Sequence, residues 1–518
     1  MSSPSVHLPE RMNAAAILVD DNVQAGRGEK LAIIGASDDT TFTYNDVREQ
    51  TNRVGNALRD LGVRMEERVM LLVHDSPEFV FSFFGAIKIG AVPIPTNTLL
   101  KPPDYEYLLN DSRARVLVVS QSLLAQIEPI RDRLRHLRQI IVVGKPSGEQ
   151  LSFQSLMASG SPILAPEMMS KDDPCFWLYS SGTTAFPKGA VHLQHDMIVA
   201  ADLYSRPTLN LGEKDVTFSA AKLFFAYGLG NGLYFPFRAG ATTILYGGKP
   251  EPADVYEIIQ RHRPSVFYSV PTGYAGMLAM EDAEKRFDTS SLRLCVSAGE
   301  ALPPALFERF KTRFGVEILD GIGSTEILHI FISNRAGRVK PGSTGEAVPG
   351  YEAKIVDEKG QELPPGEIGD LLIKGDSTCA YYWNQHEKTK ETIQGDWIRT
   401  GDKYLRDEDD YFWYQGRTDD MLKVGGMWVS PVEVENALME HPSVLESAVV
   451  GVADSENLIK PKAFIVLKGG QPGSDELLTG LQEFVKGRIG VYKYPRWIEF
   501  VPELPKTATG KTQRYKLR

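Results

Sequence analysis

The chain has 518 residues, with 57 Lys or Arg against 67 Asp or Glu and a formal net charge of −10. At about 100 to 200 residues per domain, this length predicts two to four domains. Hydrophobic residues make up 42% and charged residues 24%, which is typical of a globular protein and excludes disordered, collagen-like and coiled-coil chains. The acidic balance argues against nucleic acid as a partner, because proteins that grip a phosphate backbone show a basic excess.

The cysteines and the apolar runs exclude further classes. Cys175, Cys295 and Cys379 stand far apart with no CxxC pair, so we expect buried thiols rather than disulfides or a zinc site. The most apolar stretch, residues 79–95, contains Lys88, two glycines and two prolines, and does not match a bilayer span of about 20 apolar residues. The N-terminus shows no signal-peptide pattern. We therefore expect a cytoplasmic protein without a membrane partner.

Helical and strand patterns alternate through the first part of the chain. Apolar residues at helical spacing predict a helix over residues 45–61, ended by Gly62. A second helix, opened by Pro77, is predicted over residues 77–89. Strands are predicted at residues 69–73, 115–120, 140–143, 265–270 and 292–296. This alternation, which continues to about residue 330, predicts stacked parallel-type α/β sheets with helices on both faces.

The pattern changes after residue 340. Short alternating runs separated by Gly, Pro and Asp clusters predict a small β-barrel-like subdomain over about 340–415. Beyond it, helices are predicted at residues 431–440 and 474–489, and strands at residues 447–452 and 462–467. These elements predict α+β structure. We expect a large N-terminal domain, 1–417, and a C-terminal domain, 418–518, whose size is normal for one domain.

The strongest local motif is YSSGTTAFPKG, from Tyr179 to Gly189. A strand that runs into small residues, hydroxyl groups and one lysine offers the N–H donors and the cation that a polyphosphate needs. Gly182 and Lys188 have Walker A spacing, but Pro187 stands where that motif requires Gly. A surface turn without a ligand is the alternative interpretation of the motif alone.

A second near-match, PKTATGKT at residues 505–512, has Pro505 in place of the first Walker glycine. No room for a βαβ unit follows it, so a P-loop NTPase is disfavoured. Taken alone, this turn is more typical of a solvated loop.

Several blocks between these motifs complete a recognisable order: SAGEALP, DGIGSTE, TGD and GRTDD, at residues 297–303, 320–326, 400–402 and 416–420. With the terminal Lys511, this order resembles the acyl-adenylate-forming (ANL) superfamily, which includes acyl-CoA synthetases, nonribosomal adenylation domains and luciferases. The resemblance covers nearly the full length. AKLFFAYGLG at 221–230 and GSTEILHIF at 323–331 look like the benzoate-CoA ligase branch of aryl-CoA synthetases.

The resemblance implies an AMP-forming acid-thiol ligase. Such an enzyme activates benzoate, or a hydroxy- or amino-benzoate, as an acyl-AMP with release of pyrophosphate, and then transfers the acyl group to coenzyme A. ATP, Mg²⁺ and CoA are the implied cofactor and co-substrates, and a monomer or homodimer is expected. The implied fold is a large α/β domain with the β-barrel-like subdomain, followed by a small mobile α+β domain.

The resemblance also implies the nucleotide-binding residues. Phosphates would contact Ser180, Ser181, Gly182, Thr183, Thr184 and Lys188. Glu326, after the Thr325 hydroxyl, would hold Mg²⁺, which prefers carboxylate and phosphate oxygen. The nucleotide slot would be formed by Gly299, Glu300, Ala301, Asp320, Gly321, Ile322, Gly323 and Ser324. Asp402 would accept the ribose hydroxyls, with Arg417 behind it.

Three C-terminal positions carry over as well. Lys511 would be the adenylation catalyst, because a cation that bridges two anions screens their repulsion in the transition state. Asp419 matches the hinge of the C-terminal domain. Gly426 matches the glycine of the pantetheine tunnel, where a side chain would block the way.

The predicted acyl pocket comprises Phe225, Ala226, Tyr227, Gly228, His329 and Ile330. Small residues beside aromatic ones favour a flat slot for a single ring. His329 either bonds the substrate or is a packed histidine bonded to backbone.

Some positions depart from the family pattern or invite another interpretation. Ala185 stands where the phosphate loop usually has Gly, and Ile322 replaces an aromatic residue of many relatives. His192 and His195, spaced i and i+3, are interpreted as helix-surface histidines rather than metal ligands.

Two other functions stay open at the level of sequence. The chain could adenylate an aryl acid and load it onto the pantetheine of a carrier protein. It could also be a non-catalytic nucleotide-binding homologue, although that would require the loss of a catalytic residue, and Lys188, Glu326 and Lys511 are all present.

Overall fold

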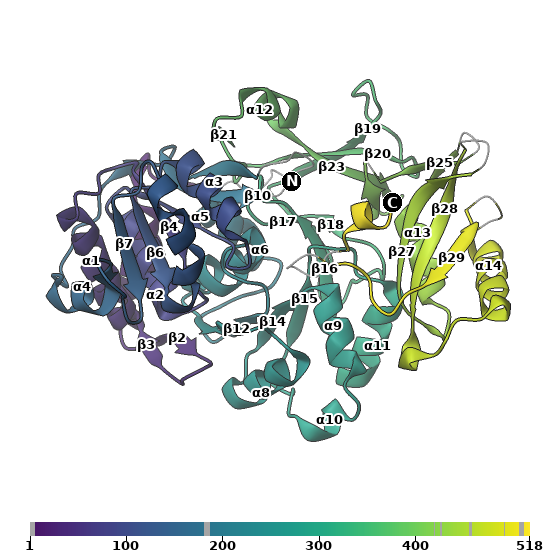
Figure 1. Ribbon diagram of the computed structural model, residues 1–518, viewed down its shortest axis with the longest axis horizontal. Coiled ribbons are helices and arrows are strands. Elements are labelled where there is room, and N and C mark those ends of the chain that lie inside the picture. The colour runs from purple at the N-terminus through teal and green to yellow at the C-terminus, as the bar shows by residue number, and fades with distance from the viewer. Residues whose placement is uncertain are drawn as a thin grey trace.

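The structure is a computed structural model that describes residues 6–180, 187–418, 420–424, 427–454, 458–489, 491, 493–506 and 512–518. Two sheets with their helices form the larger part of the molecule, on the left and in the centre of Figure 1, and the C-terminal segment lies on the right. The predicted mixed α/β class with parallel sheets is confirmed.

The central sheet has nine strands in the order β18-β17-β16-β15-β14-β12-β13-β2-β3. All pairs from β16 through β2 are parallel, and the pairs at both ends are antiparallel. Its strands are β2 (Leu31–Gly35), β3 (Thr41–Thr43), β12 (Val216–Ser219), β13 (Thr242–Leu245), β14 (Val266–Ser269), β15 (Leu294–Ser297), β16 (Ile318–Gly323), β17 (Ile330–Ser333) and β18 (Glu346–Ala347). Strands β12 to β15 contain almost only buried residues, as expected for a parallel sheet covered on both faces.

Helices on this sheet are α8 (Pro252–His262), α9 (Pro271–Ala279), α10 (Ala283–Arg286) and α11 (Pro304–Phe314). They lie at the bottom of Figure 1. Helices α5 (Asp196–Ala200), α6 (Ala226–Leu229) and α7 (Phe235–Ala239) belong to the main core on the other side.

The second sheet is wholly parallel, in the order β5-β4-β6-β7-β8. Its strands are β4 (Arg68–Leu72), β5 (Val92–Pro95), β6 (Val116–Ser120), β7 (Gln139–Val143) and β8 (Leu151–Ser152), and its helices are α1 (Tyr44–Asp60), α2 (Pro77–Lys88), α3 (Pro102–Ser112) and α4 (Phe153–Ser159). Helix α1 begins at a capping box in which Thr43 and Asp46 satisfy each other's backbone N–H groups.

Helix α2 explains the most apolar run of the sequence, because every residue from Phe79 to Lys88 is buried. Its lysine, Lys88, ends in an ion pair with Asp20 at 2.7 Å. Within the described residues, no helix has the length and apolar character needed to cross a bilayer. The three cysteines are free and buried, as predicted.

A three-stranded sheet joins these layers. It consists of β10 (Pro174–Ser180), β11 (Lys188–Leu193) and β21 (Tyr381–Tyr382), all antiparallel. The predicted phosphate loop is the connection between β10 and β11. Strand β21 comes from nearly 200 residues further along and pairs with β11.

The region predicted to be β-rich is an antiparallel sheet. Its strands are β19 (Glu352–Val356), β20 (Gly369–Lys374), β22 (Ile393–Gln394), β23 (Trp397–Arg406) and β24 (Phe412–Arg417), with α12 (His386–Thr392) beside them. It lies at the top of Figure 1.

The C-terminal segment has its own core. Its elements are β25 (Leu422–Val424), β26 (Met427–Val429), α13 (Pro431–Met439), β27 (Val444–Ala453), β28 (Ile459–Leu467), α14 (Asp475–Ile489) and β29 (Trp497–Phe500). Two hydrophobic clusters draw only on residues after 421, whereas the other clusters draw on residues before 415. The predicted division between 417 and 418 stays a prediction, and this separation of cores supports it.

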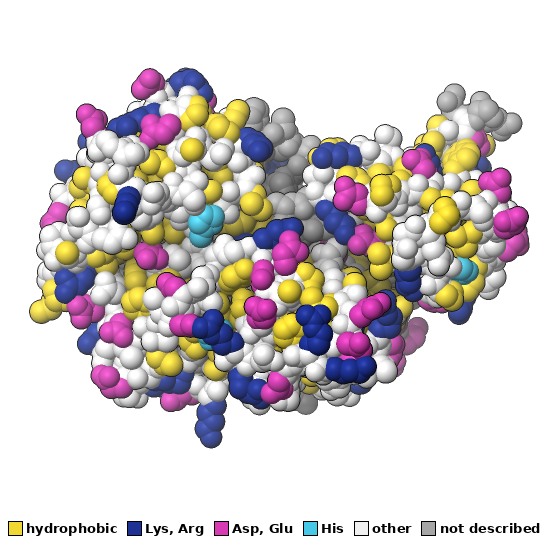
Figure 2. All heavy atoms as spheres, turned by 60° about the horizontal axis from the view of Figure 1, so that its bottom comes forward, with side chains coloured by type: hydrophobic (Ala, Val, Ile, Leu, Met, Phe, Trp, Pro, Cys, Tyr) yellow, Lys and Arg dark blue, Asp and Glu magenta, His cyan; other side chains and the backbone are white. Residues whose placement is uncertain are grey.

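On the face shown in Figure 2, acidic and basic side chains are interspersed, with apolar side chains scattered between them. The net charge of −10 is thus spread over a mixed surface on this face.

Candidate functional site

Lys188 and Glu326 meet at one aromatic side chain, that of Tyr382. The Lys188 ammonium lies 4.7 Å from the centre of the Tyr382 ring, and the Tyr382 hydroxyl donates to Glu326 Oε1 at 2.7 Å. Ser180 Oγ is 3.4 Å from the same carboxylate oxygen. Burial lowers the pKa of Lys188, while Glu326 opposes that shift. The structure therefore brings together three predicted residues through one that the sequence did not indicate.

The backbone around Glu326 is held from strand β11 and from the segment that precedes β21. His192 Nε2 on β11 lies 2.8 Å from the Thr325 carbonyl oxygen, and the Cys379 N–H donates to the Glu326 carbonyl oxygen at 2.6 Å. Ser324 Oγ accepts from the Ile327 N–H at 3.2 Å and closes the turn. The turn that presents Thr325 and Glu326 is thus fixed by long-range bonds.

The interpretation of His192 and His195 as helix-surface residues is wrong. His192 is fully buried on β11, with Nδ1 2.7 Å from Asp196 Oδ2. His195 precedes α5, and its ring nitrogens lie 2.8 Å from the Lys171 carbonyl oxygen and 3.0 Å from that of Asp376. The i, i+3 spacing misled because the first histidine belongs to an extended strand, where helical spacing has no meaning.

Mg²⁺ fits the donor set at Glu326. Among the described residues, no group of three or more His, Cys, Asp or Glu side chains is placed to hold a metal ion. One carboxylate with phosphate oxygens and water is nevertheless the usual coordination of Mg²⁺ beside a nucleotide. Glu326 has one oxygen engaged by Tyr382 and Ser180, which leaves Oε2 as the candidate metal ligand.

The predicted nucleotide slot is built from the ends of β15 and β16. Gly299 follows β15 with φ +94°, which favours glycine. Asp320 on β16 is buried and accepts from the Leu302 N–H at 3.3 Å, and burial raises its pKa well above the usual value. Glu300 Oε1 accepts from the backbone N–H of Thr512 at 3.0 Å. The slot therefore contacts the C-terminal tail directly.

The predicted ribose contacts are neighbours across β23 and β24. Asp402 pairs in register with Arg417, and Arg417 Nη1 lies 3.0 Å from Asp402 Oδ1. Although burial lowers the pKa of Arg417, Asp402 and other nearby groups raise it overall. Gly401 has φ +76°, and a Cβ there would come within 2.9 Å of the guanidinium. The pair is thus preformed.

The predicted acyl pocket is rich in aromatic side chains, and three of its residues, Gly228, His329 and Ile330, are buried. The Tyr227 hydroxyl donates to the Val296 and Ser269 carbonyl oxygens at 3.0 and 3.2 Å. His329 Nε2 lies 3.1 Å from both the Tyr227 carbonyl oxygen and Asn231 Oδ1. Because a carbonyl oxygen only accepts, Nε2 carries the proton. Burial lowers the pKa of His329 to about 3, so the ring is neutral near pH 7.

The backbone before the pocket is anchored by residues that the sequence did not single out. Both carboxylate oxygens of the buried Asp75 accept from the Leu223 N–H, at 3.1 and 3.3 Å. Lys222 Nζ donates to the Tyr246 and Gly248 carbonyl oxygens, both at 2.6 Å.

Gly228 lies directly against that backbone. A Cβ at this position would come within 2.0 Å of the Lys222 carbonyl oxygen. The absence of a side chain at Gly228 is therefore a packing requirement, independent of any ligand.

The C-terminal tail is attached to its own part of the molecule by a partly buried ion pair. Arg514 Nη2 lies 2.9 and 2.8 Å from the two carboxylate oxygens of Glu435 on α13. Predictions for Ser181, Gly182, Thr183, Thr184, Ala185, Asp419, Gly426 and Lys511 fall outside the described residues.

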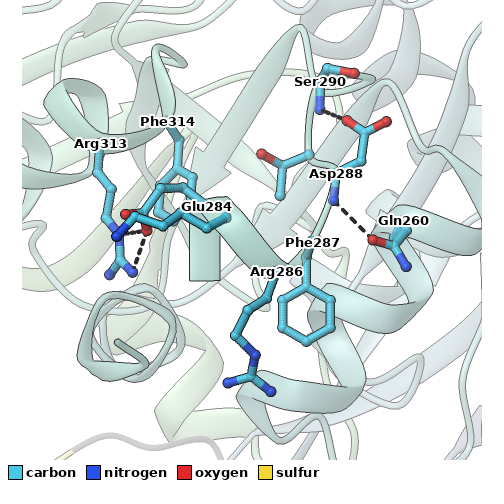
Figure 3. A pocket seen from close by; sticks show the side chains of 10 residues that line it. Gln260, Glu284, Arg286, Phe287, Asp288, Ser290, Arg313 and Phe314 are labelled. Atoms are coloured by element: carbon cyan, nitrogen blue, oxygen red, sulfur yellow. Dashed lines mark hydrogen bonds and ion pairs between the residues drawn. The ribbon is translucent and has the colours of Figure 1, made fainter. Parts of the chain in front are cut away.

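A hollow of about 600 Å³ lies elsewhere, between α8, α10 and α11 (Figure 3). Arg313 is paired with Glu284 at 2.6 Å, and Asp288 accepts from the Ser290 N–H at 2.8 Å. None of the predicted site residues lines it.

Comparison with known families identifies the family of this chain. The family described as "AMP-binding enzyme" matches residues 20–383, and "AMP-binding enzyme C-terminal domain" matches residues 433–511. The chain therefore belongs to the AMP-binding enzyme family, the acyl-adenylate-forming ligases indicated by its motifs.

Its relatives are similar over their whole length. The benzoate–CoA ligase of Thauera aromatica is 53% identical over 99% of this chain and 97% of its own. The crystal structure of the anthranilate CoA ligase AuaEII in complex with anthranoyl-AMP has a TM-score of 0.95 at 49% identity, covering 98% of this chain and 97% of its own. A benzoate CoA ligase from Burkholderia xenovorans LB400 has a TM-score of 0.91 at 47% identity, covering 98% of this chain and all of its own.

Proposed function

We propose that this chain is an ATP-dependent aryl-CoA ligase that converts benzoate, or a hydroxy- or amino-benzoate, into its CoA thioester. The observation that carries the proposal is that the predicted nucleotide slot and acyl pocket share a wall. On adjacent strands, Gly323 is paired in register with Ile330, and a Cβ at Gly321 would come within 2.9 Å of the Ile330 side chain. A reaction that joins an acid to AMP requires such contiguous sites.

The pocket supports an aromatic acid. Tyr227 and His329 are in contact, with ring centres 5.5 Å apart, and the close approach of Gly228 to the backbone leaves no side chain there. Aromatic walls with few polar groups favour a planar ring. The likeness to ligases of benzoate and anthranilate points the same way.

In the first half-reaction, a carboxylate oxygen attacks the α-phosphorus of ATP, and the bond to the β-phosphate breaks to release pyrophosphate. Lys188 would bind the leaving phosphates, and Asp402 with Arg417 would hold the ribose. Lys511 would screen the repulsion between the carboxylate and the α-phosphate. Mg²⁺ bound at Glu326 would neutralise phosphate charge.

In the second half-reaction, the CoA sulfur attacks the acyl carbon and AMP leaves. An acyl-AMP is a better electrophile than a carboxylate, because its leaving group is a phosphate monoester rather than oxide. The C-terminal domain would rotate about Asp419 to withdraw Lys511 and present the thiol path past Gly426. A cytoplasmic location and a monomeric or homodimeric state remain predictions from the sequence.

A panel of acids tests the proposal. Pyrophosphate release would be measured with benzoate, its 2-, 3- and 4-hydroxy and amino forms, and a medium-chain fatty acid. We expect aryl acids to be preferred, and a clear preference for the fatty acid would refute the aryl pocket. Comparing CoA with a pantetheinylated carrier protein as the acceptor separates a CoA ligase from a loading enzyme.

A further inference from the structure

The segment from Ser377 to Trp383 is bonded both to the Glu326 turn and to strand β11. Toward the turn, Ser377 Oγ donates to the Ile327 carbonyl oxygen at 2.8 Å, in addition to the bonds from Cys379 and Tyr382. Toward β11, the N–H groups of Ala380 and Trp383 donate to the Val191 and Gly189 carbonyl oxygens at 2.9 and 2.8 Å. This segment therefore fixes the distance between the strand of Lys188 and the turn of Glu326.

Tyr382 is the side chain of this segment that touches both charged groups. It is 3% exposed, with its ring against the Lys188 ammonium and its hydroxyl on Glu326. A carboxylate only accepts hydrogen bonds, so the Tyr382 hydroxyl is the donor in this contact. Lys188 and Glu326 both belong to the residues that the structure describes, and their side chains form no direct ion pair with each other.

Opposite charges in a partly buried site attract strongly, and a direct ion pair would neutralise both groups. Lys188 would then be less available to phosphate, and Glu326 to a metal ion. A phenol satisfies the two groups separately, since an aromatic face attracts a cation and a hydroxyl donates to a carboxylate.

We propose that Tyr382 is a positioning residue that keeps Lys188 and Glu326 apart, so that both charges remain available to the triphosphate and its metal ion. This inference rests on the proposed function for the roles of the two charged groups. It adds a residue whose contribution neither the motifs nor the resemblance assigned.

Two substitutions separate the two contacts. Tyr382→Phe keeps the ring face for Lys188 and removes the hydroxyl, whereas Tyr382→Leu removes both. We expect kcat/KM for ATP in benzoate-dependent pyrophosphate release to fall about tenfold in the first and about a hundredfold in the second. Thioester formation from supplied benzoyl-AMP and CoA should stay within about twofold, because that step does not use the phosphates that leave.

The neighbouring residue is the matched control. Tyr381 lies on the same strand but is 37% exposed, so Tyr381→Phe should leave both half-reactions within about twofold. Equal activity of Tyr382→Phe and the unaltered protein in pyrophosphate release would overturn the inference. So would an equal loss in both half-reactions, which indicates general damage to the fold.

A binding measurement tests the separation of charges without catalysis or metal. ATP affinity would be measured by calorimetry in EDTA for Glu326→Gln, Tyr382→Leu and the double variant. If Tyr382 keeps the charges apart, Glu326→Gln should strengthen ATP binding about threefold alone and more than tenfold with Tyr382→Leu, because it frees a trapped Lys188. An equal effect in both backgrounds overturns the inference.

If Tyr382→Leu does not fold, the same three-variant comparison is made with Tyr382→Phe in its place, and its outcome tests the inference in the same way. The binding experiment also needs no acid substrate. A protein that fails to activate benzoate would refute the proposed function while this cycle still tests the role of Tyr382.

Discussion

The predicted acyl pocket and the predicted phosphate end of the site differ in burial and in charge. The pocket belongs to the main hydrophobic core, where Tyr204, Phe235 and His329 are almost fully buried and His329 is neutral. At the other end, Glu326 is partly buried and Arg417 is exposed, and both have charged or hydrogen-bonded partners. Changes in the predicted acyl pocket should therefore alter stability as well as substrate choice, whereas changes at the exposed groups of the predicted phosphate end should alter mainly nucleotide binding.

The largest effect on activity is expected from a substitution at Lys511, in the C-terminal tail. Lys511→Ala should lower acyl-AMP formation by at least about a thousandfold, because no other predicted group screens the attacking carboxylate. Melting temperature and thioester formation from supplied benzoyl-AMP should change little. Lys506→Ala is the control, since Lys506 pairs with Glu446 at 2.8 Å. Normal adenylation by the Lys511 variant would refute its role.

A substitution of the buried His329 should instead change how the free energy of unfolding depends on pH. The pKa of His329 is about 6.5 in the unfolded chain and about 3 when folded, so the unfolded state binds the extra proton between these values. The folded state therefore loses stability as the pH falls from 6.5 toward 3. His329→Phe lacks this titrating group. Between pH 7 and pH 4, its free energy of unfolding should therefore fall by about 3 kcal/mol less than that of the unaltered protein.

Denaturant titrations at several pH values measure this difference. His386 occupies an exposed position, so His386→Phe should follow the unaltered protein. Parallel curves for His329→Phe and the unaltered protein would show that the buried imidazole is not the source of the pH dependence.

A smaller effect of the same kind is expected at Gly228. A Cβ there meets the Lys222 carbonyl oxygen at 2.0 Å, so Gly228→Ala should cost about 2 kcal/mol of stability. The KM for benzoate should rise, while the KM for ATP stays unchanged. At Gly212 a Cβ meets nothing within 4 Å, which makes Gly212→Ala the control in thermal melting. Equal melting temperatures would contradict the packing argument.

The smallest effect is predicted at the exposed side of the nucleotide site. Arg417→Lys keeps the charge but loses the guanidinium whose Nη1 contacts both Asp402 and the Thr400 carbonyl oxygen, so the KM for ATP should rise about threefold. Arg406 pairs with Asp410 instead, so Arg406→Lys should leave the KM for ATP unchanged. A loss of stability in Arg417→Lys would weaken the contrast between the two ends.

The regular elements were predictable because each is specified by local patterns. The helix predicted over 45–61 is α1, Tyr44–Asp60, and the one predicted over 77–89 is α2, Pro77–Lys88. The antiparallel region after residue 340 followed from its turn residues. Spacing and end signals suffice where neighbours in sequence determine the structure.

The supports of the site were not predictable, because they act between distant residues. Tyr382 reaches Glu326 across 56 positions, and Asp75 reaches Leu223 across 148. Neither stands in a motif with chemical spacing. A buried Asp or Tyr has no signature until the sheets bring it beside its partner.

The hydrogen bond between Thr512 and Glu300 offers a spectroscopic view of motion. The Thr512 amide is the first described group after Lys511, and it donates its proton to Glu300 Oε1 at 3.0 Å, a bond that slows exchange with solvent. Rotation of the tail with α13, to which Arg514 is bonded, would expose this amide to exchange with deuterium. Its exchange rate would therefore report the fraction of time that the tail carrying Lys511 spends at the predicted nucleotide slot.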